Sequence, residues 1–231
     1  MLSDVMEDYL KAIFTLQEES PPPVSTSRIA DHLGVTPPTV TSMMEKLEDR
    51  GLVTREKYKG VELTQEGRTV ALEVIRHHRL LEAYLAEHLD YEWSEVHEEA
   101  DVLEHHISEE FERRVAETLE QPNVDPHGDP IPSENLDSIP EDDTTPMTSV
   151  EVGTSVIVCR VRDDDQTELD YLAEIGIVPG REIEMLEVTP IGMYRIRVDG
   201  EEEHLPEAIA QTVRVRPIDE TDADSKEASR P

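Results

Sequence analysis

Apolar residues recur at helical spacing over the first half of the chain, and capping residues and helix breakers divide this pattern into six segments. We predict helices over residues 3–18, 25–34, 36–51, 65–89, 95–107 and 108–121. Gly34 and Gly51 can adopt the left-handed backbone that ends a helix, and Pro37 is tolerated in a first helical turn. The second and third helices are therefore separated only by a tight turn of about three residues.

Short runs rich in β-branched residues predict strands in two places. Residues 51–54 and 61–64 predict a hairpin with a turn at Lys59–Gly60. After Thr148, short apolar runs separated by Gly and Pro predict a small β-barrel of about 70 residues. Its predicted strands are Ser155–Val161, Glu182–Val188, Tyr194–Val198 and Thr212–Val215.

The order of these elements predicts an α+β multidomain protein. Six prolines between residues 122 and 146 indicate a linker or extended strap between the helical and β-rich parts. We predict a winged helix-turn-helix over 1–70, an all-α domain over 71–121, the linker over 122–147, the barrel over 148–217 and a disordered acidic tail over 218–231.

The chain of 231 residues carries 54 Asp and Glu against 21 Lys and Arg, a formal net charge of -33. Because these acidic residues are interleaved with regular apolar periods, we interpret the charge as that of a folded protein from a halophile, in which salt screens self-repulsion. Such a charge is shared by all proteins of that cytoplasm and therefore excludes no partner, nucleic acid included.

The cysteine count and the hydropathy of the chain bear on where in the cell the protein is found. Cys159 is the only cysteine, which excludes an internal disulfide and a multi-cysteine zinc site. No apolar run approaches the roughly 18 residues of a membrane span, and the acidic N-terminus differs from a signal peptide. We expect a cytoplasmic protein without a membrane partner.

Two helices joined by a tight turn and followed by a hairpin predict a winged helix-turn-helix, whose second helix can enter the major groove of DNA. Hydroxyls at the start of that helix and basic residues in the hairpin suit contacts with phosphates and base edges. The candidate DNA-binding residues are Thr36, Pro38, Thr39, Thr41, Ser42, Arg55, Lys57 and Lys59. The alternative is a protein-binding module with a solvated helix start.

Six of the nine histidines lie between residues 77 and 106. The helix predicted over 95–107 places four potential ligands on one face, namely His97, Asp101, Glu104 and His105. His78 and Glu82 form a similar pair on the preceding helix. Imidazole and carboxylate donors without thiolate suit one or two ions such as Mn²⁺ or Fe²⁺. The alternative is a set of solvated charges around a packed histidine.

No HExxH motif, nucleophile constellation or phosphate-binding glycine loop is present, so we expect neither an enzyme nor a small organic ligand.

Five segments resemble the diphtheria toxin repressor family of metal-dependent transcriptional repressors. They are Met6–Leu10, Gly34–Gly51, Arg76–Glu82, Val96–Ala100 and Leu103–Ser108. Leu172–Gly180 is similar to the SH3-like, FeoA-type barrel that ends the longer members, so the resemblance extends over residues 1–217. It implies a repressor that binds double-stranded operator DNA as a homodimer, with residues 95–120 as the dimer surface.

The resemblance also implies two metal sites per subunit. The implied regulatory site contains Asp8, Asp101, Glu104 and His105. The implied companion site contains His78, Glu82 and His97, to which the barrel adds Asp165 and Glu168. Manganese sensors of the family have carboxylates at positions 8 and 101, whereas iron sensors tend to have Met and Cys there, so we favour Mn²⁺ with Fe²⁺ as the alternative.

Two features of the implied regulatory site bear on mechanism. Asp8 lies on the first helix of the DNA-binding domain, so a bound ion would join that domain to the helical one and select the dimer that matches successive major grooves. Lys11 stands where the manganese branch often has a ligand carboxylate, which argues against a close binuclear pair. A metal-independent winged-helix regulator and a metal-buffering protein with an idle helix-turn-helix are the alternatives.

Overall fold

The structure is a computed structural model that describes residues 2–56, 59–136, 139, 143–163 and 165–218. The described chain divides into two compact units, each with its own hydrophobic core. Unit 1 comprises Met1–Leu81, Ala100–Glu120 and Ile131–Ile139. Unit 2 comprises Glu82–Glu99, Gln121–Pro130 and Pro140–Pro231. Lys57 and nearly all of the predicted tail lie outside the described residues.

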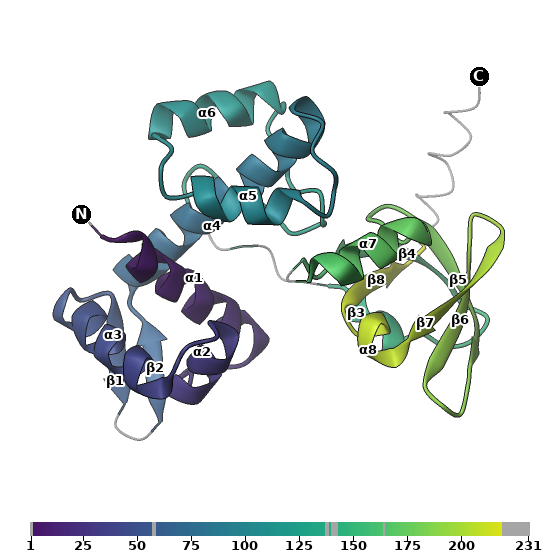
Figure 1. The fold of residues 1–231 in the computed structure, drawn as a ribbon, viewed down its shortest axis with the longest axis horizontal. Helices are drawn as coiled ribbons and strands as arrows, with labels where there is room; N and C mark the ends of the chain where they lie inside the picture. The colour runs from purple at the N-terminus through teal and green to yellow at the C-terminus, as the bar shows by residue number, and fades with distance from the viewer. Residues whose placement is uncertain (1, 57–58, 137–138, 140–142, 164, 219–231) are drawn as a thin grey trace. The chain divides into compact units, whose positions relative to one another are not determined.

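Unit 1 contains the predicted winged helix-turn-helix (Figure 1). Its helices are α1 (Asp4–Glu19), α2 (Thr26–His32) and α3 (Pro37–Asp49), and its wing is the antiparallel hairpin of β1 (Val53–Glu56) and β2 (Gly60–Leu63). Gly34 and Gly51 have φ angles of 63° and 73°, as predicted for helix stops. Ser25 Oγ accepts a hydrogen bond from the Arg28 amide and so caps α2. Thr36 precedes α3 without making a side-chain cap.

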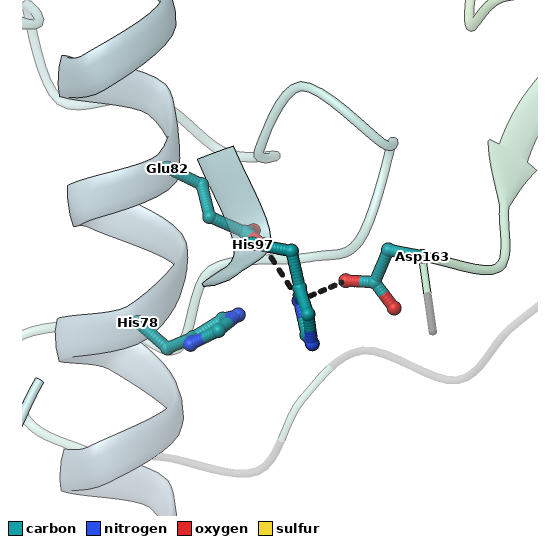
Figure 2. Close-up of side chains that lie close together, drawn as sticks. All are labelled: His78, Glu82, His97 and Asp163. Carbon is teal, nitrogen blue, oxygen red and sulfur yellow. Dashed lines mark hydrogen bonds and ion pairs between the residues drawn. The ribbon is translucent and has the colours of Figure 1, made fainter. Parts of the chain in front are cut away.

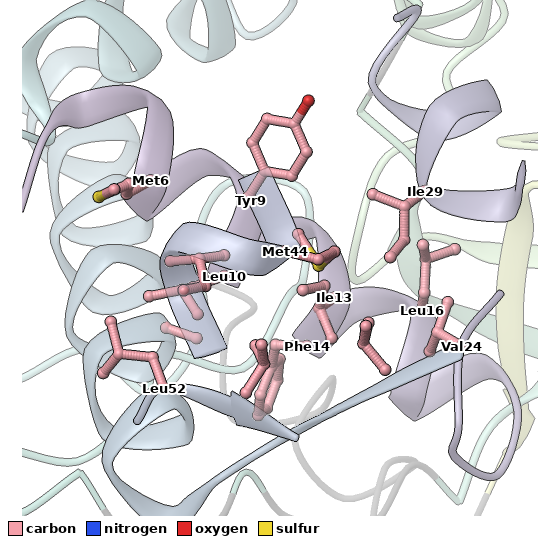
Figure 3. Close-up of a cluster of buried hydrophobic side chains, with 14 of the residues drawn as sticks. Met6, Tyr9, Leu10, Ile13, Phe14, Leu16, Val24, Ile29, Met44 and Leu52 are labelled. Atoms are coloured by element: carbon pink, nitrogen blue, oxygen red, sulfur yellow. The ribbon is translucent and has the colours of Figure 1, made fainter. Parts of the chain in front are cut away.

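The core of unit 1 is a cluster of aliphatic and aromatic side chains from α1–α3, the wing and the start of the following helix (Figure 3). Leu10, Ile13 and Phe14 of α1 are almost completely buried there. Each side chain of this size contributes roughly 1.5–3 kcal/mol when it leaves water. The buried face therefore fixes the rotation of α1 and with it the direction of the polar residues on its other side.

Three further helices follow the wing: α4 (Gln65–His88), α5 (Val96–Leu103) and α6 (Glu109–Thr118). The predicted helix over 95–107 is too long, because α5 ends at Leu103 and the chain turns through Glu104 and His105. Ser108 caps α6: its Oγ accepts a hydrogen bond from the Phe111 amide. A capping residue has an extended backbone, so α5 cannot continue as far as Ser108.

Unit 2 is built on an antiparallel six-stranded sheet in the order β3-β8-β4-β5-β6-β7 (Figure 1). The strands are β3 (Thr145–Pro146), β4 (Ser155–Val161), β5 (Glu182–Val188), β6 (Met193–Val198), β7 (Glu201–Pro206) and β8 (Val213–Pro217). The short helices are η1 (Met147–Ser149), α7 (Gln166–Glu174) and α8 (Glu207–Ala210). Leu169 and Leu172 of α7 are buried in the core of the sheet.

Several features of unit 2 differ from the prediction. β7 was not predicted, because it is a sheet-edge strand that opens with Glu201–Glu203 and lacks apolar alternation. Ser94, predicted to cap a helix at 95, instead donates its hydroxyl hydrogen bond to Asp170 on α7. The predicted linker is partly packed: Val124 pairs with Pro130 in a β-bridge, and the Trp93 indole donates to the Pro126 carbonyl at 2.8 Å.

Within the described residues, no helix combines the length and the apolar character that crossing a bilayer requires.

Candidate metal centre

The first group of potential ligands, the α1 cluster, consists of Asp8, Glu104 and His105. Asp8 Oδ1 lies 2.9 Å from His105 Nε2, which is 3.4 Å from Glu104 Oε1. On the other side of the ring, His105 Nδ1 donates to Glu7 Oε2 at 2.8 Å. This bond turns Nε2 toward the two carboxylates, the orientation that a ligating imidazole requires.

The charges within the α1 cluster shift the pKa values of two of its members, His105 and Asp8. Burial opposes the charge on His105, but the carboxylates of Glu7, Glu104 and Asp8 outweigh it and raise the pKa of its imidazole. Burial also raises the pKa of the Asp8 carboxyl. In the metal-free protein a proton on His105 therefore partly offsets the carboxylates, and a bound divalent ion would replace it.

A second group, the lysine cluster, lies beside the first and shares Glu104 with it. Lys11 Nζ is 2.8 Å from Glu104 Oε2, 3.0 Å from Asp101 Oδ1 and 3.1 Å from His78 Nδ1. The Glu104 side chain is 1% exposed and that of His78 is 5% exposed, so both depend on their neighbours for polar contacts. Asp101, predicted beside Asp8, lies here instead.

A third group, the unit 2 cluster, is centred on Glu82 of α4, His97 of α5 and Asp163, which follows β4 (Figure 2). His97 Nδ1 lies 3.1 Å from Glu82 Oε1 and 3.3 Å from Asp163 Oδ2. His78 precedes Glu82 by one turn of α4, and its ring is on the same side of the helix (Figure 2). Glu82 and His97, two of the three residues predicted for the companion site, lie together here, and their role as metal ligands stays a prediction.

Two buried residues of the predicted linker, Asp125 and His127, also belong to the unit 2 cluster, and sequence reasoning missed them. His127 Nδ1 is 3.8 Å from both Glu82 Oε2 and Asp163 Oδ2, while its Nε2 donates to the Trp93 carbonyl at 3.0 Å. The signal in the sequence was that His127, the one histidine of the proline-rich segment 122–147, follows Asp125 by two residues.

The barrel residues predicted as ligands are placed differently. Asp165 caps α7, its Oδ1 accepting hydrogen bonds from the amides of Thr167 and Glu168 at 2.9 and 3.1 Å. Neither Asp165 nor Glu168 belongs to a ligand group among the described residues, and Asp163 takes that place. The four residues predicted on one helix face also separate, because α5 ends before Glu104: His97 joins the unit 2 cluster and the other three lie in unit 1.

The titration of His127 gives a pH-dependent stability. Burial alone would lower its pKa, but Glu82 and Asp163 outweigh burial and raise the pKa to about 9. Because the folded-state pKa is raised, the stabilisation is fully present below the ordinary value of about 6.5 and is lost as pH rises through about 9. We expect the free energy of unfolding of the metal-free protein to fall by about 1–3 kcal/mol over this range.

Urea denaturation in chelator at about pH 6.5 and about pH 9 measures this fall. The His127→Gln variant should reduce it and leave the smaller part that comes from His105, whose pKa is also raised. An equal fall in the variant would contradict the assignment to His127.

The candidate DNA-binding residues of α3 are accessible. Exposed side chains at its start are Thr36, Pro38, Thr39, Thr41 and Ser42. The Thr36 and Thr39 hydroxyls lie 2.8 Å apart, and the Thr41 hydroxyl donates to the Pro37 carbonyl at 3.0 Å. These bonds are local, so the hydroxyls can still accept from or donate to a partner. Their contact with DNA stays a prediction.

The two basic residues of the wing that the structure describes, Arg55 and Lys59, are paired with acidic neighbours. Arg55 Nε donates to Glu48 Oε2 at 2.7 Å, and Lys59 Nζ lies 2.6 Å from Glu56 Oε2. Both cations line a cavity of about 570 Å³ between α2, α3 and the wing. The predicted basic cluster is therefore partly neutralised within the protein itself.

A winged helix-turn-helix whose first helix contributes a carboxylate to a cluster of imidazole and carboxylate groups is the architecture of a metal-dependent transcriptional regulator. The chain matches the iron dependent repressor N-terminal DNA binding domain over residues 1–61 and the iron dependent repressor metal binding and dimerisation domain over 64–133. Residues 145–217 match the FeoA domain. The chain belongs to the iron-dependent repressor family, of which the diphtheria toxin repressor is a member.

Individual relatives span nearly the whole chain. The iron-dependent repressor IdeR of Mycobacterium tuberculosis is 34% identical, with 94% of this chain and 99% of the relative covered. The diphtheria toxin repressor of Corynebacterium diphtheriae is 31% identical, with 94% and 99% covered. A solved manganese-dependent transcriptional repressor in complex with manganese has a TM-score of 0.84 and 37% identity, covering 92% of this chain and 100% of that one.

Proposed function

We propose that this protein represses transcription by binding operator DNA as a homodimer when divalent ions occupy the α1 cluster and the unit 2 cluster, with Mn²⁺ favoured and Fe²⁺ as the alternative. The observation that carries the proposal is the 2.9 Å approach of Asp8 on α1 to His105 beyond α5. This contact joins α1, which shares the core of unit 1 with α3, to the segment after α5. A metal ion bound here can therefore fix the position of α3, the recognition helix.

The chemistry of the donors supports the choice of metal. Asp8, Glu104 and His105 offer carboxylate oxygen and imidazole nitrogen, and the one cysteine of the chain, Cys159, lies on β4 outside every ligand group among the described residues. Such a set suits Mn²⁺ and leaves Fe²⁺ as an alternative, whereas softer ions prefer sulfur. When bound, the ion supplies positive charge and directional bonds between α1 and the segment after α5.

The unit 2 cluster supports a second ion. Glu82 and His97 come from helices, Asp163 comes from the segment that follows β4, and His127 comes from the segment between the helices and β4. A bound ion would therefore attach the barrel to the helices of unit 2, a structural role that differs from that of the α1 cluster.

Exposed apolar side chains support the dimer. Val102 on α5 is 63% exposed and Phe111 on α6 is 44% exposed, both within the predicted dimer surface over 95–120. Apolar side chains of this size gain free energy when a partner covers them, which favours an isologous contact between two copies.

The pairing of Arg55 with Glu48 predicts a gain-of-affinity variant. Because Glu48 competes with DNA phosphates for the guanidinium, Glu48→Gln should raise the affinity for operator DNA about 2- to 5-fold. Fluorescence anisotropy with Mn²⁺ present measures the change. Glu62→Gln is the matched control, since Glu62 is exposed on β2 and changes the same charge on the wing. Equal gains in both variants would show a non-specific charge effect instead.

Retention of fragmented genomic DNA by the purified protein in molar KCl tests the proposal. The retained fragments are to be compared in the presence of Mn²⁺, of Fe²⁺ under anaerobic conditions, and of chelator. The proposal expects specific fragments to be retained with Mn²⁺ or Fe²⁺ and lost in chelator. Equal retention in chelator would favour a metal-independent regulator, and the absence of retention in all conditions would favour metal buffering.

A further inference from the structure

Lys11 places an ammonium group where three potential metal ligands converge. The ligand atoms of His78, Asp101 and Glu104 lie close enough together to hold a divalent ion. The Lys11 Nζ stands within 3.1 Å of one atom from each of them. The protein therefore supplies its own cation to this ligand set.

The helix fixes the backbone of Lys11, and the contacts with His78, Asp101 and Glu104 hold its ammonium. Its neighbour Leu10 is completely buried in the core of unit 1, so α1 cannot rotate to withdraw the lysine without disrupting that core. Burial opposes the charge of the ammonium, but Glu104 and Asp101 outweigh burial and raise the pKa of Lys11 above its ordinary value.

Glu104 divides its two oxygens between the α1 cluster and the lysine cluster. Oε2 accepts from Lys11 at 2.8 Å, and Oε1 faces His105 Nε2 at 3.4 Å. A hard divalent ion lies about 2.0–2.6 Å from its oxygen ligands, so an ion on Asp101 and Glu104 Oε2 would occupy the same space as the ammonium and repel it. An ion on Oε1 avoids this overlap.

We propose that Lys11 determines metal stoichiometry: its ammonium occupies the position among His78, Asp101 and Glu104 and restricts unit 1 to a single divalent ion, held by Asp8, Glu104 and His105. This inference rests on the proposed function, because it requires the α1 cluster to bind an ion. Replacing the ammonium with a neutral group should convert the lysine cluster into a second metal position.

The test is the number of Mn²⁺ ions bound per full-length chain, measured by equilibrium dialysis in molar KCl with free Mn²⁺ read by electron paramagnetic resonance. The variants are Lys11→Met, Lys11→Gln and Lys11→Arg. Lys46→Met is the control, because Lys46 is exposed on α3 and its replacement makes the same change in net charge. Lys11→Gln, whose amide can donate to the carboxylates, guards against failure of Lys11→Met to fold.

We expect the neutral variants at position 11 to bind one Mn²⁺ more than the parent, and Lys11→Arg and Lys46→Met to match the parent. A folded neutral variant with an unchanged count would overturn the inference. The neutral variant could instead bind the same number of ions with higher affinity. That result would mean that an ion already displaces the Lys11 ammonium in the parent, and it would also overturn the inference. If Asp8→Ala removed no ion from the parent, the proposed function would fail, and this inference with it.

Discussion

Asp8→Ala is expected to abolish metal-dependent DNA binding, with a loss of about 5- to 150-fold in DNA affinity at Mn²⁺ concentrations that saturate the parent protein. Asp8 is the only member of the α1 cluster that comes from a helix of the DNA-binding domain. Without the Asp8 carboxylate, an ion bound to Glu104 and His105 would no longer be linked to α1. The variant should then bind DNA as weakly with Mn²⁺ as the parent does in chelator.

The fold should survive this substitution. The Asp8 side chain is 45% exposed, and burial raises its pKa, so the carboxylate gains little from the folded state without metal. Circular dichroism and urea denaturation in chelator check this. The control is Asp4→Ala, since Asp4 precedes Asp8 by one turn of α1 and is exposed. A full Mn²⁺ response in the Asp8 variant would remove Asp8 from the site.

Gly128→Ala is expected to lower the free energy of unfolding of unit 2 by about 3 kcal/mol or more. Gly128 has a φ of 90°, and an added Cβ would lie 1.9 Å from the Cys159 carbonyl oxygen on β4. The segment that carries His127 would have to move away from β4. The same substitution should therefore also remove the Mn²⁺ ion assigned to the unit 2 cluster.

Gly153→Ala separates these two causes. Gly153 is in the same unit and has a φ of 85°, but an added Cβ there meets open space. The free energy of unfolding of this control should fall by only about 1 kcal/mol, because alanine is less favourable than glycine at a positive φ, and the ion should stay bound. Urea denaturation and Mn²⁺ dialysis on both variants measure the difference. Equal losses in the two would show that the contact with Cys159 has no effect.

The sequence predicts elements whose signals are local. Helices α1 to α4 follow from periodic apolar residues, caps and glycine stops, and β4 and β5 follow from apolar runs that the structure reproduces with the same bounds. The end of α5 was missed because the competing signal, the Ser108 cap of α6, lies five residues beyond Leu103.

Placement of the ligands depends on tertiary contacts that a pattern does not contain. His127 is in the unit 2 cluster because Trp93 holds its ring from one side and Glu82 and Asp163 face the other. In the run from Asp163 to Asp165, the last carboxylate caps α7 and the first faces His97, a choice that depends on where α7 begins. The resemblance to known repressors supplied Asp8, which composition and spacing alone did not indicate.

The central claim is that one ion binds Asp8 on α1 together with Glu104 and His105. An anomalous difference map from crystals of the Mn²⁺-loaded protein tests it directly. We predict a manganese peak bounded by these three side chains, with Lys11 still in contact with Asp101. A manganese peak on Glu104 and His105 from which the Asp8 carboxylate has turned away would contradict it.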